Sequence, residues 1–140
     1  MKICAVICEY DPFHSGHKHQ IDKLKNEGYA VVAIMSGSFT QRGTAATISK
    51  YDRAESAVKC GADLVLELPF PYCASGASVF AAGGVHIASS LGVVDFLAFG
   101  SEQGDSEMIK TVAENMLSEE FYSALKSEKA DFGSYSQRCI

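Results

Sequence analysis

The sequence predicts an α/β fold, a Rossmann-like doubly wound parallel sheet, and three observations favour it. A chain of 140 residues with 47% hydrophobic residues is long enough for one core. Short apolar runs alternate with segments of helical spacing in the order βαβαβαβα. The runs lack polar alternation, which is typical of parallel strands covered on both faces. We expect one domain over residues 1–128 and an unpatterned tail over residues 129–140.

The first half of the chain carries clear signals for the ends of its elements. Ser15 is expected to cap the first helix, and Gly28 follows its end. Pro69 and Pro71 cannot donate to a sheet ladder and stop the third strand. The elements expected here are strands at residues 3–8, 29–35 and 63–68, and helices at residues 15–27 and from residue 49 or 50 to residue 60.

The second half begins with a helix of small residues at 75–91. Its Gly83–Gly84 pair costs about 2 kcal/mol of helix propensity, which is tolerable if another element packs very close there. We expect His86 to be buried and hydrogen-bonded within this apolar helix. A fourth strand at residues 93–99 ends at Gly100. An apolar stripe at residues 109, 112, 113 and 116 predicts one more helix, and a short final helix follows it.

Composition and charge exclude several classes of protein. Twelve basic against seventeen acidic residues give a net charge of −5, so a general nucleic-acid coat is disfavoured. The longest apolar runs fall far short of the roughly 20 residues of a spanning helix, and residues 1–11 do not read as a signal peptide. The cysteines form no CxxC pair, which indicates reduced thiols and a cytoplasmic protein. They are Cys4, Cys8, Cys60, Cys73 and Cys139, the first two on one strand face.

The most specific motif follows the first strand, at the edge where parallel sheets bind ligands. It contains His14-Ser-Gly-His17 at the entry to a helix. Gly16 would let a phosphate approach the backbone, and the helix N-terminus offers free N–H donors. Two histidine donors there would stabilise charge on a transferring phosphoryl group. Two alternatives stay open: a plain strand–helix corner, and a two-histidine metal site with Glu9 or Asp11 as third ligand.

Four motifs together resemble one family. Residues 9–17 (EYDPFHSGH), 35–43 (MSGSFTQRG), 61–69 (GADLVLELP) and 99–102 (FGSE) occur in its order and spacing. The chain is similar to the bacterial tRNA(Met) cytidine acetate ligases, which belong to the HxGH nucleotidyltransferase superfamily. The resemblance extends to about residue 117 and implies the corresponding type of α/β fold.

The resemblance implies activation of acetate by ATP to acetyl-adenylate, with release of pyrophosphate. The acetyl group then passes to N4 of the wobble cytidine of elongator tRNA(Met), which is held mainly by regions absent from this chain. Mg²⁺ would bridge the departing phosphates, and His14 and His17 would be catalytic. The implied nucleotide-binding residues are Ile7, Cys8, Glu9, Tyr10, Asp11, Pro12, Phe13, His14, Ser15, Gly16, His17, Lys18, His19, Gln20 and Gly100.

The loop at residues 36–50 is a second candidate site, because it concentrates polar and basic groups in an acidic chain. Such a loop suits a carboxylate substrate, the triphosphate or a tRNA phosphate, and the alternative is a solvated surface loop. Arg53 adds a cation close by. The segment at residues 67–71 reads as a structural stop or as a pocket wall. The substrate or phosphate candidates of the loop are Ser36, Gly37, Gln41, Arg42 and Lys50.

Three departures from the family pattern stand out. Asp11 replaces the usual asparagine, and Thr44–Ala45 replaces a Glu-Pro pair. No second basic, Ser/Thr-rich signature follows Phe99, so we expect either a fragment or a naturally short relative. Two other functions stay open: an adenylyl- or cytidylyltransferase acting on a small metabolite, and a nucleotide-binding module without turnover.

Overall fold

The structure is a computed structural model and describes residues 1–101 and 104–127. Glu102, Cys139 and the tail predicted at residues 129–140 lie outside the described residues. The chain divides into two compact units, Met1–Gly100 and Ser101–Ile140, and each is described by itself. The single domain expected over residues 1–128 stays a prediction.

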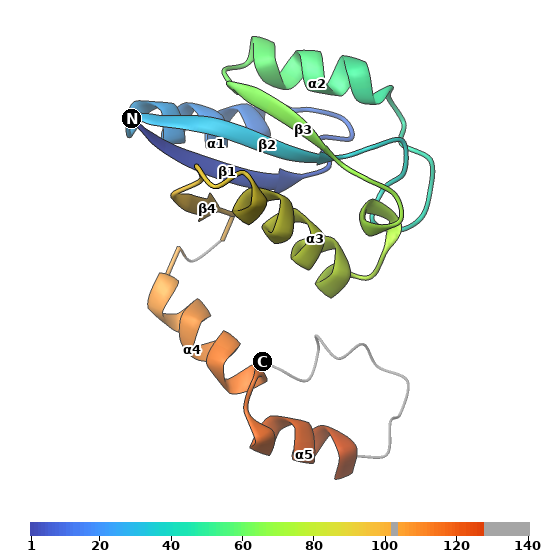
Figure 1. Ribbon diagram of the computed structural model, residues 1–140, viewed down its shortest axis with the longest axis vertical. Coiled ribbons are helices and arrows are strands. Elements are labelled where there is room, and N and C mark those ends of the chain that lie inside the picture. Colours follow the sequence, from blue (N-terminus) through green and yellow to red (C-terminus); the bar gives the residue numbers. More distant parts are fainter. Residues whose placement is uncertain (102–103, 128–140) are drawn as a thin grey trace. The chain divides into compact units, whose positions relative to one another are not determined.

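The first unit is built on four parallel strands in the order β3-β2-β1-β4. The chain steps outward from β1 to β2 and β3, and then returns to place β4 on the free side of β1 (Figure 1). The winding therefore reverses beside β1, at the point where open α/β sheets bind ligands. The strands are β1 (Lys2–Cys8), β2 (Tyr29–Ser36), β3 (Leu64–Leu68) and β4 (Phe96–Ala98).

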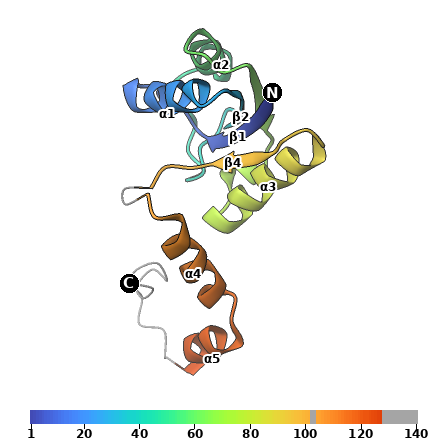
Figure 2. The same ribbon diagram turned by 90° about the vertical axis from the view of Figure 1, so that its left-hand side faces the viewer.

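Helices cover both faces of the sheet, which confirms the doubly wound architecture. On one face lie α1 (Ser15–Asn26) and α2 (Lys50–Lys59), and on the other lies α3 (Ala77–Ser90) (Figures 1 and 2). Ile21 of α1 and Ala57 of α2 pack with one set of strand residues. The opposite face packs on Ala88 of α3. Strands β1 and β2 are thus buried on both sides, as their unbroken apolar runs predict.

Two elements begin later or end earlier than expected. Strand β4 has three residues rather than seven, because it pairs only with β1, from Phe96 to Ala98. Helix α3 begins at Ala77, after the short 3₁₀ helix η1 (Tyr72–Ala74). The Ser75 hydroxyl donates to the Pro71 carbonyl at 2.7 Å and so continues the turn instead of starting the helix.

The glycine pair of α3 has the close neighbours that its propensity cost predicts. Gly83 and Gly84 are both buried. A Cβ on Gly84 would lie 2.6 Å from Ile7 Cδ1 and 2.7 Å from Ile7 Cγ1. A Cβ on Gly83 would lie 3.0 Å from Tyr72 Cβ. The pair therefore lets α3 approach β1 and η1 at distances that alanine does not permit.

Gly84→Ala is expected to destabilise the protein. Overpacking costs about 1–3 kcal/mol, and the high end applies because Ile7 Cγ1 is held close to the β1 backbone. That cost exceeds the roughly 1 kcal/mol of helix propensity that alanine gains. Denaturant unfolding measures the change, with Gly100→Ala as control because its added Cβ meets nothing within 4 Å and it lies outside the helices and strands. Equal stability of both variants would contradict the close approach.

The expectation for His86 is wrong, because its side chain is exposed. The face of α3 that meets the sheet carries Gly83, Gly84 and Ala88. His86 lies two residues beyond Gly84, about 200° around the helix. A helix that is apolar on all sides gives no sequence signal for which face is buried.

The described cysteines behave as small apolar residues. Cys4 and Cys73 are buried, Cys8 and Cys60 are partly buried, and all four are free thiols. Cys4 and Cys8 pack in the same core cluster, which confirms that they share a strand face.

The second unit holds two helices in its described part, α4 (Ser106–Met116) and α5 (Glu119–Ser127). The Asp105 side chain caps α4 by accepting from the N–H groups of Glu107 and Met108. Both helices were expected from apolar stripes in the sequence. Within residues 1–101 and 104–127, no helix has the length and apolar character needed to cross a membrane.

Candidate functional site

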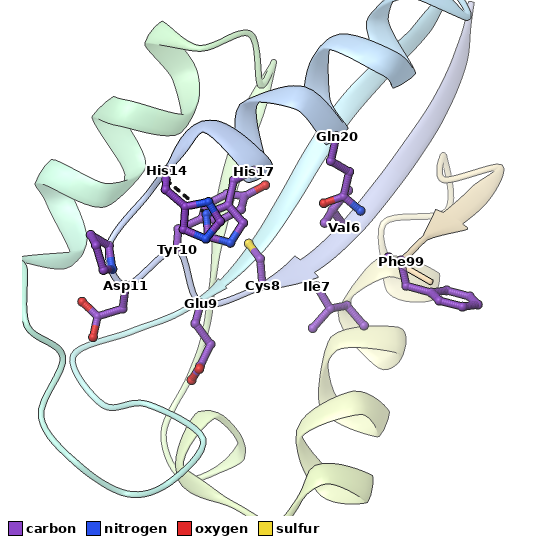
Figure 3. A pocket seen from close by; sticks show the side chains of 12 residues that line it. Val6, Ile7, Cys8, Glu9, Tyr10, Asp11, His14, His17, Gln20 and Phe99 are labelled. Carbon is purple, nitrogen blue, oxygen red and sulfur yellow. Dashed lines mark hydrogen bonds between the residues drawn. The ribbon is translucent and has the colours of Figure 1, made fainter. Parts of the chain in front are cut away.

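A cleft of about 450 Å³ opens at the carboxyl end of β1, between the start of α1 and the end of β4 (Figure 3). This is the point where the winding of the sheet reverses. Its lining residues come from two segments far apart in the sequence, residues 6–20 and residues 99–100. They are Val6, Ile7, Cys8, Glu9, Tyr10, Asp11, Pro12, His14, His17, Gln20, Phe99 and Gly100.

Most of the predicted nucleotide-binding residues line this cleft. Phe13, Ser15, Gly16, Lys18 and His19 are not among its lining residues. Val6 and Phe99 line it and were missed by the sequence. The position of Phe99, immediately before the predicted Gly100, was the one available signal for it.

His14, rather than the expected Ser15, is the N-cap of α1. Its Nδ1 accepts from the Gly16 N–H at 3.1 Å, and His17 Nδ1 accepts from the His14 N–H at 3.3 Å. The two side chains thus form a reciprocal capping box, with histidines in the places usually held by Ser or Thr and Glu or Gln. Their rings stack with centroids 3.7 Å apart (Figure 3).

The capping box fixes which nitrogen of each ring is the hydrogen-bond acceptor. A neutral imidazole has one donor and one acceptor nitrogen. Because Nδ1 of each ring accepts a backbone hydrogen bond, the proton of each lies on Nε2. Burial and, secondarily, the neighbouring His14 hold the pKa of His17 below its usual value. The pair therefore offers two Nε2–H donors at the N-terminus of a helix.

Gly16 gives the His14 ring its space. A Cβ on Gly16 would lie 3.0 Å from His14 Cε1 and 3.1 Å from His14 Nδ1. The glycine between the two histidines is thus explained by the cap itself, in addition to any approach of a ligand. Lys18, in the same turn, pairs with Asp22 at 2.6 Å on the exposed helix surface.

Tyr10 forms the floor beneath the histidines. It is 1% exposed and has a positive φ of 52°. Its ring lies 4.8 Å from that of His17 and 4.9 Å from that of Phe13, centroid to centroid. Its hydroxyl makes no hydrogen bond of ordinary length and angle among the described residues, and the Cys8 thiol lies beside it. Burial raises the pKa of the nearby Cys8 thiol to about 12, so Cys8 lines the cleft as a neutral thiol.

The two carboxylates of the turn point away from the histidine pair (Figure 3). Glu9 Oε1 accepts from the Gln41 N–H at 2.6 Å. The Asp11 carboxylate accepts from the N–H groups of Thr47 and Ile48 at 2.9 and 3.2 Å. Both acids therefore bind the backbone of the following loop. Neither carboxylate is directed toward the two histidines as the third ligand that a metal site there would need. In the part of the chain that the structure describes, no three His, Cys, Asp or Glu side chains gather as a metal group.

Asp11 is expected to make the protein acid-sensitive. Burial opposes ionisation, but hydrogen bonds from Thr47 and Ile48 outweigh it and lower the pKa of Asp11. A depressed folded-state pKa contributes stability above the unfolded value of about 3.9, and this is lost as the pH falls through the folded value. Unfolding curves between pH 7 and 2.5 should show that the free energy of unfolding falls less steeply with decreasing pH in Asp11→Asn than in wild type. The exposed Glu114→Gln serves as control, and superimposable acid limbs for Asp11→Asn and wild type would contradict this role.

The loop candidates do not line the main cleft. Ser36 and Lys50 share a second cleft of about 210 Å³ with Glu67, to which Lys50 is paired at 2.7 Å. Gly37 is buried, and a Cβ there would lie on the Glu67 carboxylate. Gln41 contributes its backbone N–H to Glu9, and Arg42 is exposed. The loop is thus bound to the turn through its backbone, with few side chains free for a ligand.

Comparison with known proteins identifies the family of the chain. The family model described as "HIGH Nucleotidyl Transferase" matches residues 1–139. The tRNA(Met) cytidine acetate ligase of Acetivibrio thermocellus is 40% identical over 136 residues, which cover 95% of this chain and 33% of the relative. That of Pediococcus pentosaceus is 50% identical over 107 residues, 75% of this chain and 29% of the relative.

Solved structures of similar fold include two of a Thermotoga maritima protein. A crystal structure of Thermotoga maritima TmcAL bound with alpha-thio ATP aligns with a TM-score of 0.83 at 37% identity. It covers 93% of this chain and 33% of that one. The apo form of the same protein aligns with a TM-score of 0.81 at 38% identity.

The resemblance to the tRNA(Met) cytidine acetate ligases is confirmed by these matches. The chain spans about a third of the length of the relatives that it matches. The matched region includes β1, the histidine pair, the reversal of the sheet and the cleft beside it. On the sequence, the sheet order and the match over residues 1–139, this chain belongs to the HIGH nucleotidyl transferase family.

Proposed function

We propose that this chain binds ATP in the cleft beside β1 and serves an ATP-dependent acetate ligase that modifies tRNA(Met). The observation that carries the proposal is the stacked His14–His17 pair, whose free Nε2–H donors stand at the N-terminus of α1. The ATP analogue bound to Thermotoga maritima TmcAL, the protein of similar structure, supports it.

The two ends of the cleft differ in chemistry, and we assign them to different parts of ATP. The triphosphate lies at the histidine end, where Nε2–H groups and the first N–H groups of α1 are donors. The adenosine lies toward Phe99 and Gly100, whose exposed ring and absent side chain leave room for a planar base. Gln20 and Ile7 form side walls.

The reaction that fits this arrangement is in-line attack by an acetate oxygen on the α-phosphorus. A bond forms between that oxygen and phosphorus, and the bond to the β-bridging oxygen breaks, giving acetyl-adenylate and pyrophosphate. His14 and His17 stabilise the negative charge that gathers on the departing pyrophosphate. The cytidine N4 amine then attacks the acetyl carbonyl, AMP leaves and N4 loses a proton. The chain contributes position and electrostatics and needs no covalent intermediate.

The described residues do not form a Mg²⁺ site of their own. Mg²⁺ prefers carboxylate oxygens, and those of Glu9 and Asp11 are engaged by backbone N–H groups. A Mg²⁺ ion would therefore enter on the phosphate oxygens of ATP. We assign no step of the reaction to it.

We propose tRNA(Met) as the acceptor and the cytoplasm as the location. The chain carries a net charge of −5, which does not suit a tRNA surface. Contacts with tRNA are accordingly assigned mainly to the parts of the relatives that lie outside the third matched by this chain.

Calorimetry with the 140-residue chain tests the site directly. ATP should bind with and without Mg²⁺, and acetate should be needed for pyrophosphate release in the same sample. No ATP binding by a folded chain would refute the site. Binding with pyrophosphate release on another small acceptor would indicate a different nucleotidyltransferase. Binding with no turnover on any acceptor would indicate a nucleotide-binding module.

The affinity for ATP should be nearly constant from pH 7 to 9. His17 is a neutral donor in this range, because its pKa is lowered, chiefly by burial, and the Nδ1 atoms of both histidines accept backbone hydrogen bonds, which leaves Nε2–H as the donor. If charged imidazolium rings bound the phosphates, affinity would fall steadily above their pKa. Calorimetric titrations at half-unit intervals distinguish the two, and a tenfold loss per unit between pH 7 and 8.5 would contradict the neutral pair.

A further inference from the structure

Arg53 is a buried cation with no acidic partner. It lies on α2, is 1% exposed, and forms no ion pair with the carboxylates of the described residues. The sequence placed it with the polar groups of the loop, but the structure turns it inward. A buried guanidinium is costly unless its donors are satisfied by well-placed acceptors.

Four acceptors of Arg53 are backbone carbonyls, and the Ser36 hydroxyl oxygen is a fifth, longer contact at 3.5 Å from Nη1. Its Nη1 donates to the Glu9 carbonyl at 2.5 Å and to the Ser36 carbonyl at 3.2 Å. Its Nη2 donates to the Gly37 carbonyl, and its Nε to the Ile48 carbonyl at 3.0 Å. One side chain therefore joins the end of β1, the end of β2 and the last part of the loop.

These bonds act on the segment that leads into the histidine pair. Glu9 directly precedes Tyr10, where the backbone turns to positive φ before reaching His14. The Glu9 carbonyl is fixed by Arg53, while the Glu9 and Asp11 carboxylates bind the loop backbone. The turn is thus held from outside, by contacts that leave the histidines free.

We propose that Arg53 is a positioning residue for the nucleotide turn, acting through the Glu9 peptide to hold His14 and His17 in their donor geometry. This rests on the proposed ATP site. Arg53 does not line the cleft, so its effect is indirect. Only the guanidinium fork satisfies four carbonyls at once, because an ammonium group has three donors at a single nitrogen.

Two variants of Arg53 test this, each with a matched control. Arg53→Met removes the cation and its donors, and Arg53→Lys keeps the cation without the fork. Lys59→Met removes an exposed cation from the same helix. Val32→Ala trims a buried residue on the opposite face of the sheet and supplies a comparable loss of stability. All are measured at a temperature where each is folded.

Arg53→Met should weaken ATP binding by about 10- to 100-fold, the scale of a small displacement of binding groups. Arg53→Lys should lie between it and wild type, and both controls should bind as wild type does. NMR of the two imidazole rings without ATP should show shifted His14 and His17 signals in Arg53→Met, smaller shifts in Arg53→Lys, and unshifted signals in both controls. Wild-type affinity in Arg53→Met, or an equal loss in Val32→Ala, would overturn the proposal.

Two outcomes remain distinguishable. If Arg53→Met does not fold, Arg53→Lys carries the test, and wild-type affinity with unshifted imidazole signals in that variant would overturn the proposal. If the wild-type chain does not bind ATP, the proposed function fails. The imidazole signals then still decide whether Arg53 positions the histidines, because they are recorded without nucleotide.

Discussion

His14→Ser should keep α1 capped and yet weaken ATP binding by about 10- to 100-fold, the equivalent of one strong hydrogen bond to a charged group. The serine hydroxyl replaces Nδ1 as acceptor for the helix N–H groups, since serine is a favoured N-cap. It does not replace the Nε2–H donor at the cleft. His14→Ala should lose ATP binding to the same extent and in addition about 1 kcal/mol of stability.

His17→Gln makes the same separation for the second ring. Glutamine is the usual partner in a capping box, so the bond to the His14 N–H is retained while the ring is removed. Calorimetry with ATP and thermal unfolding are measured on both variants and on their combination. His86→Ala is the control, because it removes an exposed histidine from α3, distant in sequence from the turn. If His14→Ser and His17→Gln bound ATP as wild type does, the histidines would be caps and nothing more.

Tyr10→Ala should cost about 3–5 kcal/mol of stability, as for other large-to-alanine changes in a core. The ring is 1% exposed and contacts those of Phe13 and His17, so its loss leaves a cavity below the histidine pair. Tyr10→Phe should cost little or be stabilising. It removes only a buried hydroxyl that makes no hydrogen bond of ordinary length and angle among the described residues.

Denaturant unfolding of the two Tyr10 variants gives the free energies. The pair separates the packing of the ring from the chemistry of the hydroxyl, since the backbone conformation demanded at this position is the same in both. A loss above 2 kcal/mol in Tyr10→Phe would show that the hydroxyl is bonded in the protein. A small loss in Tyr10→Ala would show that the floor of the cleft is not tightly packed.

The location of the site follows from the sequence, for a simple physical reason. Apolar runs without alternation mark parallel strands, and the carboxyl ends of such strands meet at one edge. The sequence alone therefore predicts that His14, His17 and Gly100 lie near one another. The Gly83–Gly84 pair likewise predicted that α3 packs closely on another element, because a helix tolerates two glycines of low helix propensity only where packing offsets their cost.

The direction of individual side chains could not be predicted in the same way. The amino-acid sequence does not indicate that His14, rather than Ser15, is the N-cap of α1, because histidine is an unusual N-cap residue. Arg53 lies between Asp52 and Glu55 in the sequence, and its burial depends on the carbonyls of Ile48 nearby and of Glu9 and Ser36 farther along the chain. His86 was misplaced because an evenly apolar helix has no recognisable outer face.

The bonds between the turn and the loop also explain why aspartate is tolerated at position 11. Its charge is taken up by Thr47 and Ile48 and does not stand beside the histidines. The sequence could raise the question of a negative charge near phosphates, but only the fold shows where that carboxylate goes.

The signature around residues 9–17 is therefore not a portable module. Its geometry depends on partners 32 to 44 residues away along the chain, at Gln41, Thr47 and Arg53. We therefore expect the donor pair to reach its final geometry only once α2 has docked and Arg53 can bind the Glu9 carbonyl. Grafting these nine residues onto another strand–helix junction would transfer the motif without its donor geometry. The loop and α2 would have to be transferred with it to restore that geometry.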